Sequence, residues 1–459
     1  MKRFYKSLAT YFAVLFFVTI TAVHSTAQSK INQDSIAQKM GWFEDAKLGI
    51  FIHYGIYAVN DVSESWSFHN KQVTWPAYMS QLSGFTASKY DATAWANLFK
   101  EAGARYTVIT TKHHDGVALW DTKEKHYDVI RNTPAKKDLI DPLVNALRKN
   151  NIKVGAYFSL IDWSHPDYPG FLKDSSRYKV ANDPARWKRF QGFFQNQLTE
   201  LSTKFNPDLW WFDGDWEHSA EEWESSKVRT NLLARNPGTI INGRLQGYGD
   251  YETPEQNFPV TRPSFKWWEL CMTTNDNWGY RKSDTNWKTP YEVISIFVDA
   301  VSNGGNLLLD IGPKADGSIP SEQVAILQEF GRWTNKHATA IYGTIAGLPY
   351  GHFHGNSTFS KDSMVLNLFI PSPQGNISDQ SKLMIPIYIK GLKSKPSSIH
   401  LIGSTIPIDY TEVGKISWSS VPGTLFLEIP ISEMDPMISV LQLTFNEPIQ
   451  LYRGKGGFH

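Results

Sequence analysis

Short apolar stretches alternate with longer, mostly polar stretches between about residues 39 and 342. The apolar stretches are continuous rather than alternating, which is typical of parallel strands covered on both faces. We predict seven such strands, at residues 48–56, 106–114, 153–163, 209–214, 239–244, 266–273 and 306–312. Because each strand is followed by a stretch long enough to return across a sheet, the pattern predicts a parallel α/β fold.

Three of the intervening stretches have helical features. Residues 88–104 place apolar side chains close to every 3.6 positions, and residues 136–151 carry Pro142 in their first turn, where a missing N–H costs little. Residues 186–205 form the third. Seven or eight strand–helix units in about 300 residues favour a (β/α)8-like barrel over a doubly wound sheet. The sequence also lacks a Gly-rich dinucleotide loop after the first strand.

The pattern changes after about Gly347. Short apolar stretches with Pro, Gly and Ser turns follow, without a helical period, at residues 364–373, 382–392, 398–404, 423–430 and 439–445. They predict an all-β domain, most simply a sandwich. A chain of 459 residues is long for a single core. We therefore expect a catalytic domain over 28–346 and a C-terminal β-sandwich domain over 347–459.

Residues 1–27 are predicted to be a secretory signal peptide. Three basic residues precede an apolar stretch at about 8–23, which is short and interrupted by Thr, and small residues follow at 25–27. The chain has a single cysteine, Cys271, so it can form no intramolecular disulfide. We expect a bacterial protein that is exported, to the periplasm or beyond the cell, and that does not insert into a membrane once the signal is removed.

Charge and composition narrow the classes of ligand. The chain has 46 Lys and Arg against 45 Asp and Glu, a formal net charge of +1. This balance gives no overall field that would attract nucleic acid or an anionic membrane, and we expect neither as a partner. Aromatic residues make up 14% of the chain, and their faces suit the apolar faces of sugar rings, although a large barrel core accounts for much of this share. The oligomeric state stays open.

Polar side chains gather at or near the carboxyl ends of the predicted strands, where barrel enzymes place their active groups. They are His53, His113, His114, Tyr157, Asp162, Asp213, Asp215, Arg244, Glu252, Glu255 and Glu269. One face of the barrel would then carry neutral histidines, an arginine, aromatic rings and several carboxylates. Paired carboxylates in such a setting are typical of glycoside hydrolysis.

A zinc site is the main alternative use of the histidines. His53, His113, His114 and Asp213 are possible ligands, but neighbours in a strand point to opposite faces, so His113 and His114 share a site only if the chain bends. The sequence contains no H-E-x-x-H, paired C-x-x-C, G-x-S-x-G or G-x-x-x-x-G-K motif. We therefore expect no metal and no cofactor.

Six separate blocks of the sequence resemble the α-L-fucosidases of glycoside hydrolase family 29. In order, they are GIFIHYGIYAV, TKHHDGVALWDT, GAYFSLIDW, LWWFDG, WELCMTTNDNWGY and NGGNLLLDIGPKADGSIP, within about residues 41–342. The resemblance implies a retaining exo-glycosidase that acts on fucosylated glycans. It also implies a (β/α)8-like catalytic domain and a C-terminal β-sandwich, in agreement with the hydrophobic pattern.

The resemblance also implies roles for individual residues. Asp213 of WFDG matches the nucleophile, whereas Asp215 matches no catalytic residue and is expected to shape the loop. Trp211 matches an aromatic wall of the fucose site, and Trp210 is expected in the core. The residues implied to hold the sugar hydroxyls or to lie beside the nucleophile are His53, His113, His114, Tyr157 and Arg244.

The catalytic acid/base is a choice among three glutamates. Glu255 is the first choice because its spacing from Asp213 and Arg244 suits one branch of the family. Glu269 is the second choice, with the alternative that it is an inward strand residue that orients a neighbour. Glu252 is the third.

The first loop departs from the family pattern. Many members have Glu directly before Trp, whereas here Ser65 separates Glu64 from Trp66. We expect Glu64 and Trp66 to contact the sugar, and Phe51 or Trp267 to accept the fucose methyl group. Other functions on the same scaffold stay open, namely another retaining exo-glycosidase, a transfucosidase or an inactive fucose-binding protein. The fucosyl linkage is not readable from the sequence.

Overall fold

The structure is a computed structural model that describes residues 36–172, 177–373 and 383–455. The predicted signal peptide, residues 1–27, lies outside the described residues. The chain divides into two compact units, Met1–Phe43 and Glu44–His459. In the first unit the described residues, 36–43, are helical. Across the described parts of the chain, no helix combines the length and the apolar character needed to span a membrane.

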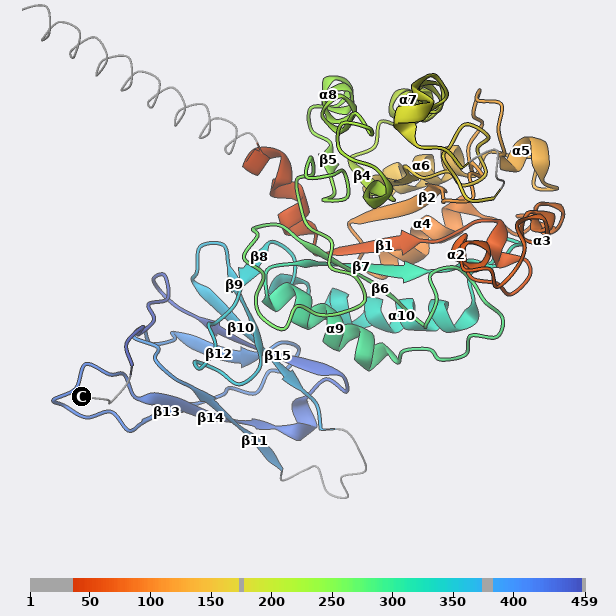
Figure 1. The fold of residues 1–459 in the computed structure, drawn as a ribbon. Coiled ribbons are helices and arrows are strands. Elements are labelled where there is room, and N and C mark those ends of the chain that lie inside the picture. Colours follow the sequence, from red (N-terminus) through yellow and green to blue (C-terminus); the bar gives the residue numbers. More distant parts are fainter. Residues whose placement is uncertain (1–35, 173–176, 374–382, 456–459) are drawn as a thin grey trace, which may run out of the picture. The chain divides into compact units, whose positions relative to one another are not determined.

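Seven parallel strands form a curled sheet in the second unit (Figure 1). Their order across the sheet is β5-β4-β3-β2-β1-β7-β6. Their bounds are β1 (Leu48–Ile52), β2 (Tyr106–Lys112), β3 (Lys153–Ser159), β4 (Leu209–Asp213), β5 (Ile240–Ile241), β6 (Glu269–Thr273) and β7 (Asn306–Ile311). All seven predicted strands are present. Every residue of β1, β2, β4, β6 and β7 is buried, which explains their unbroken apolar runs.

The seven strands form a partial barrel whose edge strands are β5 and β6. Between these two strands lies the segment at residues 251–255, which is not a regular strand. Isolated parallel bridges join this segment to both sides: Tyr251 pairs with Asn242 on one side, and Glu252 and Glu255 pair with Trp268 and Cys271 on the other. The predicted (β/α)8-like fold is confirmed as a curled parallel sheet, with this segment in place of a regular eighth strand. β5 is shorter than predicted because the chain turns back after Asn242, where the Asp250 N–H donates to the Ile241 carbonyl at 2.7 Å.

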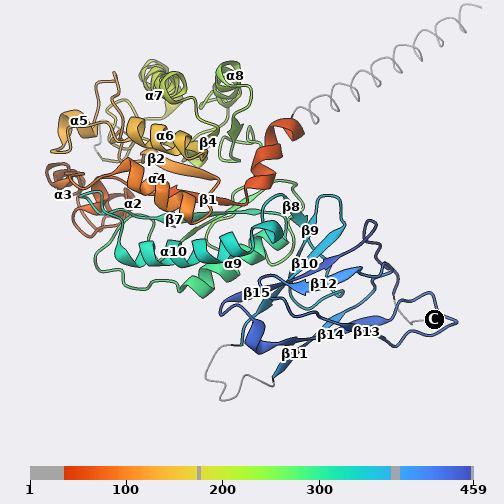
Figure 2. The same cartoon turned by 180° about the vertical axis from the view of Figure 1, so that it is seen from behind.

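Six helices cover the outside of the curled sheet (Figure 2). They are α4 (Ala92–Glu101), α6 (Ile140–Lys149), α7 (Pro184–Phe205), α8 (Ser225–Arg235), α9 (Pro290–Ser302) and α10 (Ser321–Lys336). The three predicted helices correspond to α4, α6 and α7. Side chains cap several of them: Asp91 accepts from two N–H groups of α4, and Thr289 forms a capping box with Glu292 in α9. The short helices α2 (Trp66–His69), α3 (Trp75–Met79) and α5 (Val129–Asn132) lie in the loops after β1 and β2.

The C-terminal part consists of two antiparallel sheets around a second apolar core, as predicted. The five-stranded sheet contains β8 (Thr344–Ala346), β9 (Asn356–Ser360), β10 (Val365–Pro371), β12 (Ser398–Leu401) and β15 (Ile438–Thr444). The three-stranded sheet contains β11 (Met384–Ile389), β13 (Tyr410–Val413) and β14 (Thr424–Pro430). The first strand, β8, ends one residue before Gly347, where the hydrophobic pattern changes.

Helix α10 holds the β domain against the catalytic domain. The Trp333 indole donates to the Ile438 carbonyl at 2.7 Å. Arg332 binds the buried Asp435 carboxylate through two nitrogens at 3.0 Å each, and Lys336 binds it at 3.0 Å. The β domain thus contacts α10 on the outside of the sheet, and the loops after the parallel strands form the site.

Candidate active site

Asp213 is the last residue of β4, at the carboxyl end of the sheet, and is 8% exposed. Its Oδ2 accepts a hydrogen bond from the Tyr157 hydroxyl at 2.8 Å and lies 3.5 Å from His114 Nε2. Its Oδ1 accepts from Arg244 Nη1 at 3.0 Å. Three different segments therefore position one carboxylate and stabilise its negative charge, as a carboxylate nucleophile requires.

Successive side chains of β4 point to opposite faces of the sheet, so its aromatic residues lie alternately in the core and at the pocket. Trp210 and Phe212 belong to the hydrophobic core, with their rings stacked at a centroid distance of 5.9 Å. Trp211 points to the same side as Asp213 and lines the pocket. Both positions agree with the prediction from the sequence.

A tight turn follows the nucleophile candidate and is shaped by Asp215. Gly214 has φ of 80°, and a Cβ there would meet the Ile161 side chain at 2.4 Å, so the turn requires glycine. The Asp215 carboxylate accepts from the Gln246 N–H at 2.7 Å, and its carbonyl accepts from the Gln246 side chain at 2.6 Å. Asp215 thus ties this turn to the loop after β5, the loop-shaping role expected for it.

Both histidines of the TKHH block reach the site because the chain bends at the end of β2. The pairing of β2 with β3 shifts register between Thr110 and Lys112, and the strand ends at Lys112. The rings of His113 and His114 then lie 4.4 Å apart, centroid to centroid. His113 lines the pocket and His114 approaches Asp213.

Each of the three site histidines is held through its Nδ1 atom. His53 Nδ1 lies 2.6 Å from Asp310 Oδ1, and His114 Nδ1 lies 2.6 Å from Ser159 Oγ. His113 Nδ1 lies 2.6 Å from Ser65 Oγ. Burial lowers the pKa of all three, to about 3 for His114. Near neutral pH these rings are uncharged and suited to hydrogen bonds with hydroxyl groups.

Arg244 joins two carboxylates through one guanidinium group. Its Nη1 binds Asp213 Oδ1 at 3.0 Å and its Nη2 binds Glu255 Oε2 at 2.6 Å. The guanidinium also lies over the Trp211 ring, 4.5 Å from its centroid. Burial works to lower the pKa of Arg244, but the charges of Asp213 and Glu255 raise it above the usual value. Glu255 is therefore next to the nucleophile candidate and lines the same pocket.

Glu269 lies in the interior of the sheet rather than at the pocket. β6 begins at Glu269, three residues later than predicted, and pairs there with the first residue of β7. Glu269 accepts hydrogen bonds from the Tyr106 hydroxyl and from Trp211 Nε1, the latter at 3.1 Å. Burial raises its pKa to about 7. Glu269 thus orients Trp211 from behind.

The other candidate acid, Glu252, is exposed and faces a separate hollow that Gly243 and Trp267 also line.

A pocket of about 170 Å³ collects most of the predicted residues. It is lined by Phe51, His53, Trp66, His113, Tyr157, Trp211, Asp213, Trp216, Arg244, Glu255 and Trp278. A small pocket with aromatic walls and a few convergent polar groups is the usual form of a monosaccharide site.

The family model for α-L-fucosidase matches residues 16–339 of the chain. The chain belongs to the α-L-fucosidase family. It is 31% identical to human tissue α-L-fucosidase over 428 residues, which cover 85% of this chain and 84% of the human protein.

Solved structures of α-L-fucosidases share the fold. α-L-Fucosidase isoenzyme 1 from Paenibacillus thiaminolyticus superposes with a TM-score of 0.78 at 30% identity, over 90% of this chain and all of that one. An α-L-fucosidase from Bacteroides thetaiotaomicron superposes with a TM-score of 0.75 at 30% identity, over 90% and 96% of the two chains. That structure holds a covalent intermediate, trapped with 2-fluoro-fucosyl fluoride in a Glu-to-Gln variant.

In this α-L-fucosidase-family chain, the inserted Ser65 has a structural use. The Ser65 hydroxyl lies 2.6 Å from His113 Nδ1, and the two neighbours of Ser65 have different environments. Trp66 lines the pocket. Glu64 is 4% exposed, and its Oε1 accepts from the Gly279 N–H at 2.5 Å. Glu64 therefore fixes the loop that carries Trp278.

Two aromatic residues of the pocket, Trp216 and Trp278, were not predicted as site residues. Both lie in loops, where no periodic pattern marks the side that a residue faces. Trp278 belongs to the WELCMTTNDNWGY block, and this block could have marked it as a site residue.

Of the two residues expected at the fucose methyl group, Phe51 lines the pocket. Trp267 lies at the separate hollow, and its indole donates to Glu44.

The described part of the chain contains no group of side chains arranged as a metal site. Among residues 36–172, 177–373 and 383–455, no cluster of three or more His, Cys, Asp and Glu side chains could hold an ion. The site histidines instead direct their Nδ1 atoms to Asp310, Ser65 and Ser159.

Proposed function

We propose that this protein is a retaining, exo-acting α-L-fucosidase that hydrolyses terminal α-L-fucose from glycans through a covalent fucosyl-enzyme intermediate. Membership of the α-L-fucosidase family supports the activity. The observation that carries the chemistry is the single guanidinium of Arg244 between Asp213 and Glu255 at the mouth of a small pocket. Retaining glycosidases place their two carboxyl groups about 5–5.5 Å apart, and two carboxylates on one guanidinium are close neighbours.

In the first step, a carboxylate oxygen of Asp213 attacks C1 of the fucose. The bond between C1 and the glycosidic oxygen breaks, and Glu255 donates a proton to that leaving oxygen. Tyr157 and Arg244 keep the attacking carboxylate in place before the reaction.

In the second step, Glu255 takes a proton from a water molecule, whose oxygen attacks C1 on the intermediate. The bond between C1 and Asp213 breaks, so the nucleophile is regenerated and fucose leaves with its original anomeric configuration. Glu255 is suited to this double role because its side chain is partly exposed and water reaches it, whereas Glu269 is fully buried.

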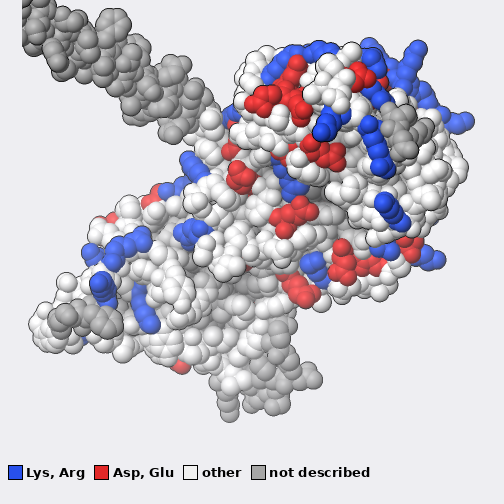
Figure 3. All heavy atoms as spheres, in the orientation of Figure 1, with Lys and Arg blue, Asp and Glu red and all other residues white. Residues whose placement is uncertain are grey.

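The pocket fits a neutral deoxy-sugar. The uncharged His53 and His113 line the pocket and offer hydrogen bonds to hydroxyl groups. The faces of Trp211, Phe51 and Trp278 suit the C–H groups and the methyl of fucose. Over the visible face of the catalytic domain, acidic and basic side chains are interspersed (Figure 3). Such a surface has no large field of one sign, in keeping with an uncharged ligand.

Hydrolysis of two aryl glycosides tests this function. We expect the purified protein to hydrolyse an aryl α-L-fucoside and to release α-L-fucose as the first product, seen by proton NMR before mutarotation. An aryl galactoside serves as the control and should react at least about a hundredfold more slowly. Absence of fucoside turnover, or faster turnover of the galactoside, would overturn the proposal. Turnover that yields mainly fucosylated acceptors would instead identify a transfucosidase.

The same proposal extends to export through the predicted signal peptide at residues 1–27. The support is the basic start, the short apolar stretch and the small residues at 25–27. Expression of the full chain in a bacterial host, followed by N-terminal sequencing of protein from the periplasm, should give a mature end near Gln28. Full-length protein that stays in the cytoplasm would contradict export without touching the proposed activity.

A further inference from the structure

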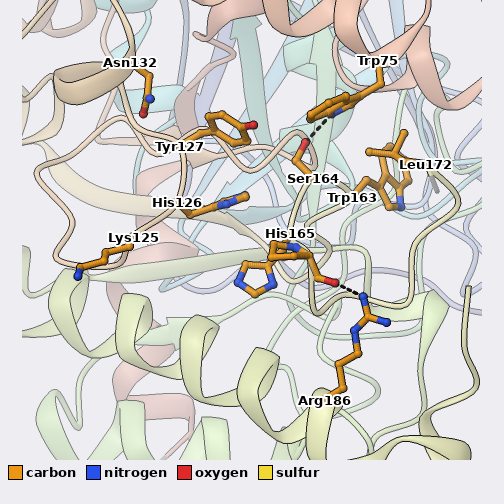
Figure 4. Close-up of a pocket in the computed structure, with 11 residues that line it drawn as sticks. Trp75, Lys125, His126, Tyr127, Asn132, Trp163, Ser164, His165, Leu172 and Arg186 are labelled. Carbon is orange, nitrogen blue, oxygen red and sulfur yellow. Dashed lines mark hydrogen bonds between the residues drawn. The ribbon is translucent and has the colours of Figure 1, made fainter. Parts of the chain in front are cut away.

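A second, wider pocket lies beside the catalytic pocket. Its volume is about 500 Å³, against about 170 Å³ for the catalytic pocket. The residues that line it include Trp75, His126, Tyr127, Trp163, Ser164 and His165 (Figure 4). We call it the wide pocket.

The wide pocket opens on the same end of the barrel as the catalytic pocket. His126 and Tyr127 follow β2, and Ser164 and His165 follow β3, so all four are on loops at the carboxyl ends of parallel strands. Barrel enzymes bind substrates at this end.

Trp163 connects the two pockets. It lines the wide pocket, and its ring lies 5.2 Å from Trp66 and 5.0 Å from His114, centroid to centroid. Trp66 in turn lines the catalytic pocket. The two pockets are thus separated by little more than two aromatic rings, and a branched ligand held in one is close to the other.

Aromatic rings form part of the wall of the wide pocket. Trp75 is held in position because its indole N–H donates to Ser164 Oγ at 2.9 Å. Tyr127 is a second aromatic residue that lines the pocket (Figure 4). Fixed aromatic faces next to polar groups suit sugar rings, which have apolar faces and hydroxyl edges.

The two histidines of the wide pocket each keep one ring nitrogen for a ligand, because the other nitrogen is held by the protein. His165 Nδ1 accepts a hydrogen bond from the Asp167 N–H at 3.1 Å, and burial lowers the pKa of His165 to about 4. The ring is therefore neutral at pH 7, with its proton on Nε2. His126 Nε2 donates to Asp162 Oδ1 at 3.3 Å, so Nδ1 is the ring nitrogen that a ligand can approach. Such a pair matches adjacent hydroxyl groups of a sugar.

A buried ion pair supports the floor of the wide pocket. Lys112 and Asp162 are fully buried, with Nζ and Oδ2 3.6 Å apart. Burial alone would raise the pKa of Asp162, but the charges of His126 and Lys112 hold it below its usual value. The ionised Asp162 then fixes two lining residues, His126 and Ser164, whose N–H donates to Asp162 Oδ1 at 3.2 Å. Buried charges are costly, and here the pair positions residues that the catalytic pocket does not use.

The positive side chains at this site do not make it an anion site. Arg186 already contacts Asp167 at 3.5 Å and donates to the Pro166 carbonyl. Lys125 is exposed at the edge of the pocket. The wall therefore favours a neutral sugar over one with a carboxylate or sulfate.

We propose that the wide pocket is a carbohydrate-binding subsite that holds a second, neutral sugar of the same glycan while its terminal fucose occupies the catalytic pocket. The ligand class is a hexose or an N-acetylhexosamine. This subsite rests on the proposed fucosidase activity, and it makes the enzyme more efficient on branched oligosaccharides than on simple fucosides.

The test compares two substrates in the same variants. The probes are an aryl α-L-fucoside, which fills the catalytic pocket alone, and a panel of fucosylated lactose and N-acetyllactosamine oligosaccharides of increasing length and branching. For Trp75→Ala we expect kcat/KM to fall about tenfold for the best oligosaccharide of the panel, mainly through KM, and by less than about twofold for the aryl fucoside. The matched control is Trp418→Ala, because Trp418 is 76% exposed in the β domain.

A second variant guards against a folding defect in the first. Tyr127→Phe keeps the ring and removes only the hydroxyl, and it should lower kcat/KM for the same oligosaccharide about threefold. Equal losses on both substrate types, or no loss on any oligosaccharide of the panel, would overturn the subsite while the fucosidase proposal stands. Wild-type protein that hydrolyses no fucoside at all would overturn the proposed function first.

Discussion

The rim of the sheet and its interior each present a glutamate to the Arg244–Trp211 pair, in opposite environments. At the rim, Glu255 is partly exposed, binds Arg244 at 2.6 Å and lines the pocket. In the interior, Glu269 is fully buried, binds Trp211 at 3.1 Å and has its pKa raised to about 7 by burial. A carboxyl group with such a pKa would be a good proton donor, but it must also reach the substrate. The contrast is the reason that we propose Glu255 as the acid/base, because a proton donor needs access to the pocket as well as a suitable pKa.

The largest effect is expected from removing Asp213, the carboxylate that we propose as the nucleophile. Asp213→Gly should lower kcat by at least about a thousandfold, because the covalent route is lost. Azide should then restore turnover and give β-fucosyl azide, detected by NMR and mass spectrometry.

Asp215→Asn is the matched control for that experiment. Asp215 lies two residues away and contacts Gln246 rather than the pocket. We expect a lower melting temperature and a kcat within about tenfold of wild type. A loss as large as that of Asp213→Gly, or azide rescue of the Asp215 variant, would contradict the assignment of the nucleophile.

The next largest effect separates the rim from the interior directly. Glu255→Ala should lower kcat/KM about a hundredfold or more for a natural glycan, and much less for an aryl fucoside with a good leaving group. Azide should restore turnover of the aryl fucoside and yield the α-fucosyl product. Glu252→Ala is the control, since Glu252 is exposed at a separate hollow. If Glu269→Gln, and not Glu255→Ala, behaved in this way, the roles of rim and interior would be reversed.

Trp211 connects the two regions, since its ring contacts Arg244 and its N–H donates to Glu269. Trp211→Phe keeps an aromatic wall and removes the hydrogen bond. We expect KM for an aryl fucoside to rise about tenfold with a smaller change in kcat, as for a group that shapes the pocket. Steady-state kinetics check this, and an effect confined to kcat would argue against it.

The smallest catalytic effect is expected for Glu269→Gln, which should leave kcat within about threefold of wild type. The glutamine oxygen can still accept from Trp211, and its NH2 can donate to the Tyr106 oxygen. Stability should respond instead. The pKa of Glu269 rises from 4.5 to about 7 on folding, so the folded state holds a proton that the unfolded state has lost between these pH values.

The sign of the stability change follows from proton linkage. The wild type loses stability as pH rises from about 4.5 to about 7, by roughly 3 kcal/mol if the full shift applies. The glutamine variant lacks this loss. The melting temperature of the variant minus that of the wild type, measured at pH 5, 6 and 7, should therefore increase as pH rises. A difference that stays constant with pH would mean that Glu269 is not protonated in the folded protein.

Much of the fold was predictable because buried parallel strands carry continuous apolar runs. All seven predicted strands are present. His53, Asp213 and Arg244, which were predicted from the rule that strand ends carry active groups, line one pocket. The same rule does not place Glu269, because β6 begins three residues later than its apolar run. The aromatic residues of the loops, Trp216 and Trp278, had no periodic pattern to mark them.

By itself, the sequence determined the parallel α/β fold, the β domain, the family blocks and Asp213 as candidate nucleophile, because these depend on local pattern and on residues within one strand. Only the tertiary structure distinguishes the surroundings of Glu255 from those of Glu269, and our proposal of Glu255 as the acid/base depends on that difference. Glu255 lies on an irregular segment whose place is set by its bridge to Cys271 and by Arg244, contacts between residues far apart in the chain. Distances of that kind are determined by how strands pack against one another, and no local pattern encodes them.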